Sequence, residues 1–151
     1  MSSKICTASA VASAAFSIPS SVAALATPSS THVQAFLSWA ARTFQQLEDF
    51  PRPTIAAIDG RCRGAASVLA VHCDFRIMGE GVEFFFPEVP AGMILGWGAI
   101  SRLVALCGPS RTKQMVLFGE FLDAKTCANW GLADEEIEQR TLCRAGWEAA
   151  S

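Results

Sequence analysis

The stretch that decides the fold is Pro53-Thr-Ile-Ala-Ala-Ile-Asp-Gly-Arg-Cys-Arg-Gly-Ala-Ala-Ser-Val-Leu-Ala-Val-His-Cys-Asp-Phe-Arg-Ile77. Residues 54–58 are short and continuously apolar, as expected of a strand that is buried on both faces. Residues 59–64 predict a turn, residues 65–73 a helix and residues 75–78 a second strand. A strand, a turn, a helix and another strand form a βαβ unit, whose crossover is right-handed. The sequence therefore predicts an α/β fold.

The flanking segments continue this alternation. On the amino-terminal side, Thr31 and Gln34 fit a capping box, and Pro51 ends the helix that follows. The apolar face of that helix is formed by residues at helical spacing, namely Val33, Phe36, Leu37, Ala40, Phe44 and Leu47. On the carboxyl-terminal side, residues 82–86 predict a strand. Three further helices are predicted at 98–107, 110–118 and 124–130, with Gly108-Pro109 separating the first two.

Length and charge limit the class of protein. The 151 residues suit one domain, and 12 basic against 14 acidic residues give a net charge of −2. That balance argues against nucleic-acid binding, which needs a basic face. No apolar run reaches the roughly 18 residues of a membrane span. Hydrophobic residues make up 51% of the chain, an excess that indicates surface covered by another subunit or by further chain.

Cysteine and histidine are too sparsely arranged to predict a metal site. The six cysteines include no C-x-x-C pair, and the chain has only two histidines. We therefore expect no metal and mainly free thiols, as in a reducing compartment.

Residues 1–31 differ in composition from the rest. They are rich in Ser and Ala, carry a single charge at Lys4, and precede every acidic residue. This low-complexity segment can be a secretory signal with a cleavage site at Ala24-Leu25-Ala26, an organellar transit sequence, or part of a domain whose start is lost. We place the domain boundary here, with residues 32–151 as the core.

The turn before the central helix is the first candidate site. At the first turn of a helix the N–H groups are unpaired and the dipole favours negative charge. Gly64 is not followed by the Lys-Ser/Thr of a phosphate-binding loop, and a G-x-G-x-x-G fingerprint is also absent. The N–H of Ala65 or Ala66 can instead polarise a carbonyl oxygen; the alternative is a plain tight turn.

Glu88 is the second candidate. It follows three aromatic residues and Pro87, and an apolar pocket raises the pKa of a carboxyl group and makes it a usable proton carrier. The alternative is an exposed glutamate at a strand end. Glu80 and Glu120 are interpreted as surface charges, and His72, between apolar neighbours, as a packed residue.

Taken in order, these pieces resemble the crotonase superfamily of enoyl-CoA hydratases and isomerases. The matching stretches are Pro53–Gly60, Gly64–Ile77, Phe86–Gly92, Gly96–Gly98, Ser101–Leu103, Phe118–Glu120 and Ala124–Leu132. The resemblance implies a crotonase-like ββα spiral that binds acyl-CoA thioesters, needs no cofactor beyond the coenzyme A of its substrate, and assembles as trimers. The same resemblance implies strands before the matched region and helices from about Thr141, so we expect the fold to be incomplete at its N-terminal strands and C-terminal helices.

The resemblance also assigns roles. Glu88 is the acid and base, the Ala65 N–H after Gly64 is one oxyanion donor, the Ile18 N–H is the other, and Gly96 lines the pocket. Val68 stands where hydratases carry a first glutamate, so the chain resembles one-carboxylate enoyl-CoA isomerases more than hydratases.

Two departures from the family pattern leave a second interpretation open. Ala65 stands where the family has Gly, and Pro19 follows Ile18 where Gly belongs. The chain can therefore also be a crotonase-like remnant or oligomer-forming interaction module without turnover. We expect it in the cytoplasm, or in an organelle if residues 1–31 are a transit segment.

Overall fold

A computed structural model describes residues 6–10 and 30–138 of the chain. Its elements follow in the order β1 (Cys6–Ala10), α2 (Ser30–Glu48), β2 (Thr54–Ile58), β3 (Arg61–Arg63), α3 (Ala65–His72), β4 (Phe75–Gly79), β5 (Glu83–Phe85), α4 (Ala99–Phe118), α5 (Ala124–Trp130) and β6 (Glu135–Ile137).

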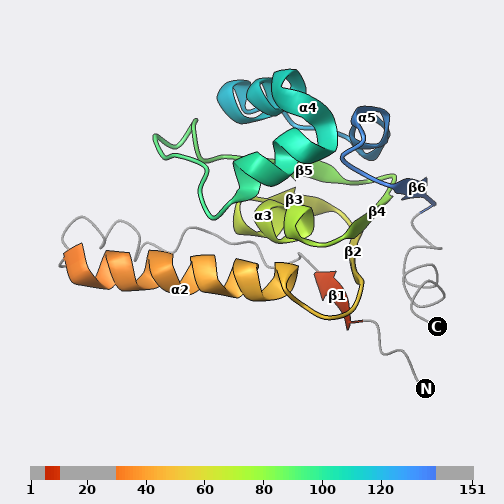
Figure 1. The fold of residues 1–151 in the computed structure, drawn as a ribbon. Coiled ribbons are helices and arrows are strands. Elements are labelled where there is room, and N and C mark those ends of the chain that lie inside the picture. The colour runs from red at the N-terminus through yellow and green to blue at the C-terminus, as the bar shows by residue number, and fades with distance from the viewer. Residues whose placement is uncertain (1–5, 11–29, 139–151) are drawn as a thin grey trace.

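The described strands form two sheets in which neighbouring strands run parallel. One sheet has the order β1-β2-β4-β6, and the smaller sheet pairs β3 with β5. Helix α3 connects the small sheet back to β4, and it packs between α2 on one side and α4 on the other (Figure 1). The predicted α/β class is confirmed, and α3 is the element around which the others are arranged.

One predicted boundary was wrong, and another was confirmed. Residues 59–64 are not only a turn, because Arg61–Arg63 form β3 and pair with Glu83–Phe85. The helices predicted at 98–107 and 110–118 are confirmed: they are the two halves of α4, separated by a kink at Gly108, where φ is 78° and ψ is 167° and the backbone is not helical. Pro109 lacks a backbone N–H and follows directly after this break.

The segment of Ser and Ala contributes a strand that its composition did not predict. Residues 6–10 form β1, which pairs in parallel with all five residues of β2. This strand lies at the edge of the larger sheet, where the family resemblance calls for strands before the matched region. Residues 1–5 and 11–29, including Ile18, lie outside the described residues.

Helix α2 is buried only toward its end. Ala40 and Phe44 are buried against the core, whereas Leu37 is 47% exposed although it lies on the predicted apolar face. Figure 1 shows the reason, since the first half of α2 extends beyond α3. The periodicity predicted the helix correctly but not the extent of its contacts.

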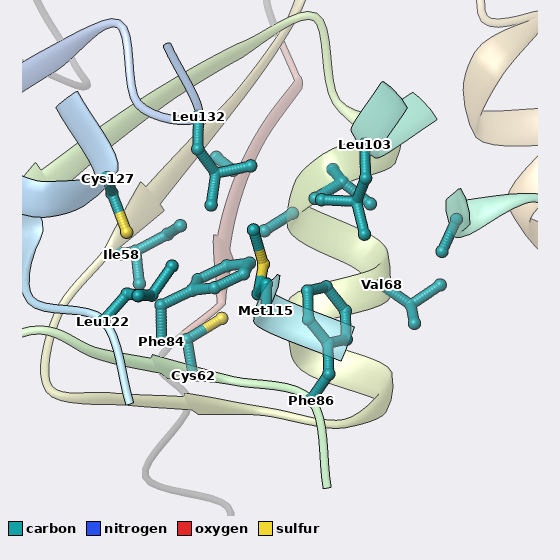
Figure 2. Packing of buried hydrophobic residues seen from close by; sticks show 14 of the residues in the cluster. Ile58, Cys62, Val68, Phe84, Phe86, Leu103, Met115, Leu122, Cys127 and Leu132 are labelled. Atoms are coloured by element: carbon teal, nitrogen blue, oxygen red, sulfur yellow. The ribbon is translucent and has the colours of Figure 1, made fainter. Parts of the chain in front are cut away.

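The main core lies between the two sheets and helices α3 to α5. Figure 2 shows side chains from five elements meeting there: Ile58 of β2, Phe84 of β5, Val68 of α3, Leu103 and Met115 of α4, and Cys127 of α5. Phe84 is fully buried and its ring meets that of Phe86 edge-on, with centroids 5.4 Å apart. Burial of this kind holds β5, and therefore the residues that follow it, in a fixed place.

Arg76 links strand β4 to the segment that follows α5. The side chain is 1% exposed, and its Nε donates to the Leu132 carbonyl at 2.7 Å while Nη1 donates to the Cys73 carbonyl at 2.7 Å. Its Nη2 also lies 3.1 Å from Oδ2 of Asp134. Because its donors are satisfied, the buried charge ties β4 to the segment after α5.

Neither α2 nor α4, the long helices of the described part of the chain, has the hydropathy of a bilayer-spanning segment.

Phe84→Ala is expected to lower the free energy of unfolding by about 3–5 kcal/mol, since it leaves a cavity in a closely packed core. Phe118→Ala is the matched control: this ring is 72% exposed, so its loss should change stability by less than about 0.5 kcal/mol. Urea unfolding of both variants measures the difference, and equal losses would contradict the assignment of the core.

Candidate active site

Gly64 forms the junction between the small sheet and α3. Its backbone has φ 57° and ψ −123°, a conformation that side chains with a Cβ rarely adopt. Its N–H donates to the Phe85 carbonyl at 3.2 Å, and its carbonyl accepts from the Val68 N–H at 2.9 Å. The Gly64 N–H is therefore already hydrogen-bonded within the protein and is not a donor for a ligand.

The Ala65 N–H differs in this respect. Ala65 is the first residue of α3, so the helix contains no acceptor for its N–H, and the positive end of the helix dipole lies at the same place. An oxygen that gains negative charge is stabilised by such a donor.

Ser67 holds this end of α3 against both strands of the small sheet. Its hydroxyl oxygen lies 2.7 Å from the Cys62 carbonyl and 2.9 Å from the Phe85 carbonyl, and the residue is fully buried. The sequence analysis gave Ser67 no role. The only signal was one polar residue in the apolar run of the helix.

The Glu88 carboxyl group lies beside Gly64. A Cβ built on Gly64 would be 3.7 Å from Oε1 of Glu88 and 3.6 Å from Cγ of Pro87. The other carboxyl oxygen, Oε2, is buried without a hydrogen-bond partner in the described part of the chain. Burial raises the pKa of Glu88 above its ordinary value. The carboxyl group thus faces the start of α3 and holds its proton more tightly than an exposed one.

A compact turn supports Glu88. The Ala91 N–H donates to the Pro87 carbonyl at 2.9 Å, the Gly92 N–H to the Val89 carbonyl at 2.9 Å, and the Met93 N–H to the Glu88 carbonyl at 2.7 Å. These bonds fix the backbone on either side of the carboxyl group.

Val68 does not contribute a second acid. It is fully buried in the hydrophobic core, and its side chain has no group that can carry a proton. Among the described residues near Gly64, Glu88 supplies the proton carrier.

The loop with Gly96 is held in place by a hydrogen bond from His72. The Gly96 carbonyl accepts from the Ala99 N–H at 3.2 Å, and Gly96 itself is exposed. Next to it, Trp97 has a positive φ of 56° and stacks on Phe44 with centroids 5.4 Å apart. Nε2 of His72 donates to the Trp97 carbonyl at 2.8 Å. Burial lowers the pKa of His72, so the ring is a neutral packing residue.

Arg102 fixes the far end of α3. Its Nε donates to the Val71 carbonyl at 3.1 Å, and its Nη2 donates to the carbonyls of His72 at 3.1 Å and Cys73 at 3.3 Å. A cation at a helix carboxyl end satisfies orphan carbonyls and complements the dipole. Sequence reasoning noted Arg102 only as part of a matched stretch, because an acceptor on another element has no local signature.

The site therefore brings Gly64, Ala65 and Glu88 together at the start of α3. The loop with Gly96 lies at the other end of this helix, where the Trp97 carbonyl accepts from His72. Ile18 lies outside the described residues, so its role as the second donor stays a prediction. The described ranges contain no cluster of three or more His, Cys, Asp or Glu residues that could hold a metal ion.

Glu88→Gln is expected to raise the free energy of unfolding at pH 7, because it removes a buried negative charge and keeps the shape. The folded pKa is raised above the ordinary value of 4.5, so the charged form destabilises the folded state above that raised pKa. The gain over wild type should shrink as the pH falls toward 4.5 and the wild-type carboxyl takes up its proton.

Urea unfolding between pH 7 and pH 4 measures this difference. Glu80→Gln, at an exposed glutamate, is the control and should stay within about 0.5 kcal/mol of wild type. A Glu88→Gln protein less stable than wild type at pH 7, or a difference independent of pH, would show that the carboxyl is not buried as described.

Comparisons with known proteins identify the family. The family model for enoyl-CoA hydratase/isomerase matches residues 11–150. An enoyl-CoA isomerase/hydratase of Mycosarcoma maydis is 39% identical over 123 residues, which is 81% of this chain and 45% of that protein. A crotonyl-CoA hydratase of Syntrophomonas wolfei is 33% identical over 101 residues, or 67% of this chain and 39% of that protein.

Among solved structures, the enoyl-CoA hydratase of Bacillus anthracis superposes with a TM-score of 0.78 at 30% identity, covering 83% of this chain and 48% of that one. The chain spans less than half the length of the curated relatives it matches. The family match covers nearly the whole chain and includes the Gly64–Ala65 turn and Glu88. The chain belongs to the enoyl-CoA hydratase/isomerase family.

Proposed function

We propose that the chain is an acyl-CoA-binding enzyme that moves a double bond, a one-carboxylate enoyl-CoA isomerase. The observation that carries the proposal is the half-buried carboxyl group of Glu88, which lies beside Gly64 at the start of α3 and whose Oε2 has no hydrogen-bond partner among the described residues. A thioester oxygen near the Ala65 N–H would place the carbon next to its carbonyl within reach of Glu88.

The proposed reaction starts with a 3-enoyl-CoA. The Glu88 carboxylate takes a proton from C2, and the electron pair of that C–H bond moves into the thioester carbonyl to give an enolate. The Ala65 N–H donates to the enolate oxygen while the negative charge is present. The Glu88 carboxyl then returns its proton to C4, the double bond moves to C2–C3, and the carboxylate is regenerated.

Isomerisation fits these residues better than hydration. Hydration needs one group to activate water and another to protonate the carbon, whereas moving a double bond needs one base that gives back the same proton. Val68 supplies no acid at the position where the resemblance places one. The relatives carry names of both kinds, hydratase and isomerase/hydratase.

No cofactor is required beyond the coenzyme A of the substrate, as is general for the family.

We further propose a trimer-based homo-oligomer in the cytoplasm. The oligomer is supported by exposed apolar side chains such as Ile94, at 87% exposure, and Met93, at 50%. The compartment is supported by the free thiols of Cys62, Cys73, Cys107 and Cys127.

The same exposed side chains favour a second candidate, a crotonase-like module that assembles with complete relatives without turnover. The Cβ of Ala65, next to the proposed oxyanion donor, also favours it. The two candidates differ in whether Glu88 exchanges protons with a bound thioester.

Wild-type protein is expected to convert a 3-enoyl-CoA into the 2-enoyl-CoA, followed by the absorbance of the conjugated thioester. Glu88→Gln should reduce the rate by about 10²–10⁴-fold, the usual contribution of a general acid–base. Little 3-hydroxyacyl-CoA should form, because the site has one carboxyl group.

Glu80→Gln is the matched control and should keep the wild-type rate. Equal rates for wild type and Glu88→Gln would refute the catalytic role. Calorimetric binding of acyl-CoA with no turnover in either protein would favour the non-enzymatic module, and hydration faster than isomerisation would overturn the choice of reaction.

A further inference from the structure

Gly119 contacts the turn that carries Glu88. It ends α4 with φ 61° and ψ 44°. A Cβ built on it would lie 2.6 Å from Cγ of Pro90 and 3.3 Å from Cδ of the same ring. Carbon atoms in ordinary contact are about 3.5–4.0 Å apart, so the Pro90 ring occupies the space that a side chain at position 119 would need.

Pro90 is connected to the carboxyl group through a short, hydrogen-bonded stretch. It lies two residues after Glu88, inside the turn closed by the bonds from Ala91 to Pro87 and from Met93 to Glu88. The pyrrolidine ring is rigid, so a group pressing on it moves the backbone of the turn and not only the ring.

A side chain at position 119 would also meet the other half of the site. The same Cβ would lie 3.4 Å from Cε2 of Phe85, and the Phe85 carbonyl accepts the Gly64 N–H and lies 2.9 Å from the Ser67 hydroxyl. The end of α4 thus bears on both the turn with Glu88 and the strand that holds the start of α3.

We propose that Gly119 is a positioning residue: the missing side chain at the end of α4 seats Pro90 and so sets where the Glu88 carboxyl group lies relative to Gly64 and Ala65. Gly119 touches no reacting atom and acts through Pro90. The proposal rests on the proposed function only for its kinetic consequence; the placement of the carboxyl group can be measured without turnover.

The experiment compares Gly119→Ala, Pro90→Ala and the double variant with wild type. The direct readout is the titration of the Glu88 side-chain carboxyl followed by ¹³C NMR, with Glu88→Gln used to assign its signal. Gly119→Ala is expected to bring the pKa of Glu88 back toward its ordinary value, because a displaced carboxyl loses the burial that raises it. Pro90→Ala in the same chain removes the ring that the new methyl meets and should restore the wild-type titration.

Gly108→Ala is the control for backbone strain, and it is the more severe change, because φ 78° with ψ 167° is adopted essentially by glycine alone. Gly108 also lies in α4 with a positive φ of 78°, but a Cβ there would have nothing within 4 Å. It should leave the titration of Glu88 unchanged even if it lowers stability. In the isomerase assay, Gly119→Ala should lower kcat by roughly 10²-fold with little change in KM, the effect of misplacing a reacting group by about 1 Å.

The proposal is overturned if Glu88 titrates in Gly119→Ala as it does in wild type, or if Pro90→Ala fails to restore it. If Gly119→Ala does not fold, the double variant decides. Recovery of folding when Pro90 is also changed to Ala supports the clash between position 119 and the Pro90 ring, and a double variant that also fails to fold overturns it. An inactive wild-type protein whose Glu88 titration still responds to these changes would remove the proposed function and leave the positioning role intact.

Discussion

The proposed chemistry depends on the placement of one carboxyl group next to the amino end of one short helix. Helix α3 begins at Ala65 after a glycine whose backbone few other residues adopt, and the Glu88 side chain lies against that glycine. Burial raises the pKa of the carboxyl group, while the helix end supplies an unpaired donor and a positive partial charge. The carboxyl group thus lies beside Gly64, and the Ala65 N–H, a donor that can stabilise a negatively charged oxygen, follows in the chain. The proposed enolate chemistry needs both groups.

Contacts elsewhere in the fold hold the start of α3 and the Glu88 carboxyl group in place. At its start, α3 is tied to the small sheet through Gly64 and Ser67, and at its end Arg102 donates to three carbonyls. Phe84 and Phe86 anchor the strand and the segment that lead to Glu88 in the core. The placement is therefore set by long-range packing, and the carboxyl group itself makes few bonds. An acid that is to exchange its proton is better held by its surroundings than by a salt bridge, which would lower its pKa.

Much of the fold could be predicted from local pattern. The apolar run at 54–58, the helix from Ala65 and the α5 helix capped by Asp123 follow directly from residue types. What could not be predicted arises from contacts between distant segments: β3 forms only because β5 pairs with it, and Leu37 is exposed because α2 extends past its neighbours. At the site, the motif resemblance named Gly64, Ala65 and Glu88. The roles of Ser67 and Arg102 depend on carbonyls of other elements. Their sequence signals, a polar residue in an apolar run and a place in a matched stretch, do not reveal those partners.

The most direct test follows hydrogen exchange at C2 of a saturated acyl-CoA in deuterated water, which requires neither a double bond nor a completed reaction. If the carboxyl group faces a polarised thioester, wild-type protein should introduce deuterium at C2 and Glu88→Gln should not. Deuterium entering at the same rate with both proteins, or with neither while the thioester is bound, would contradict the account.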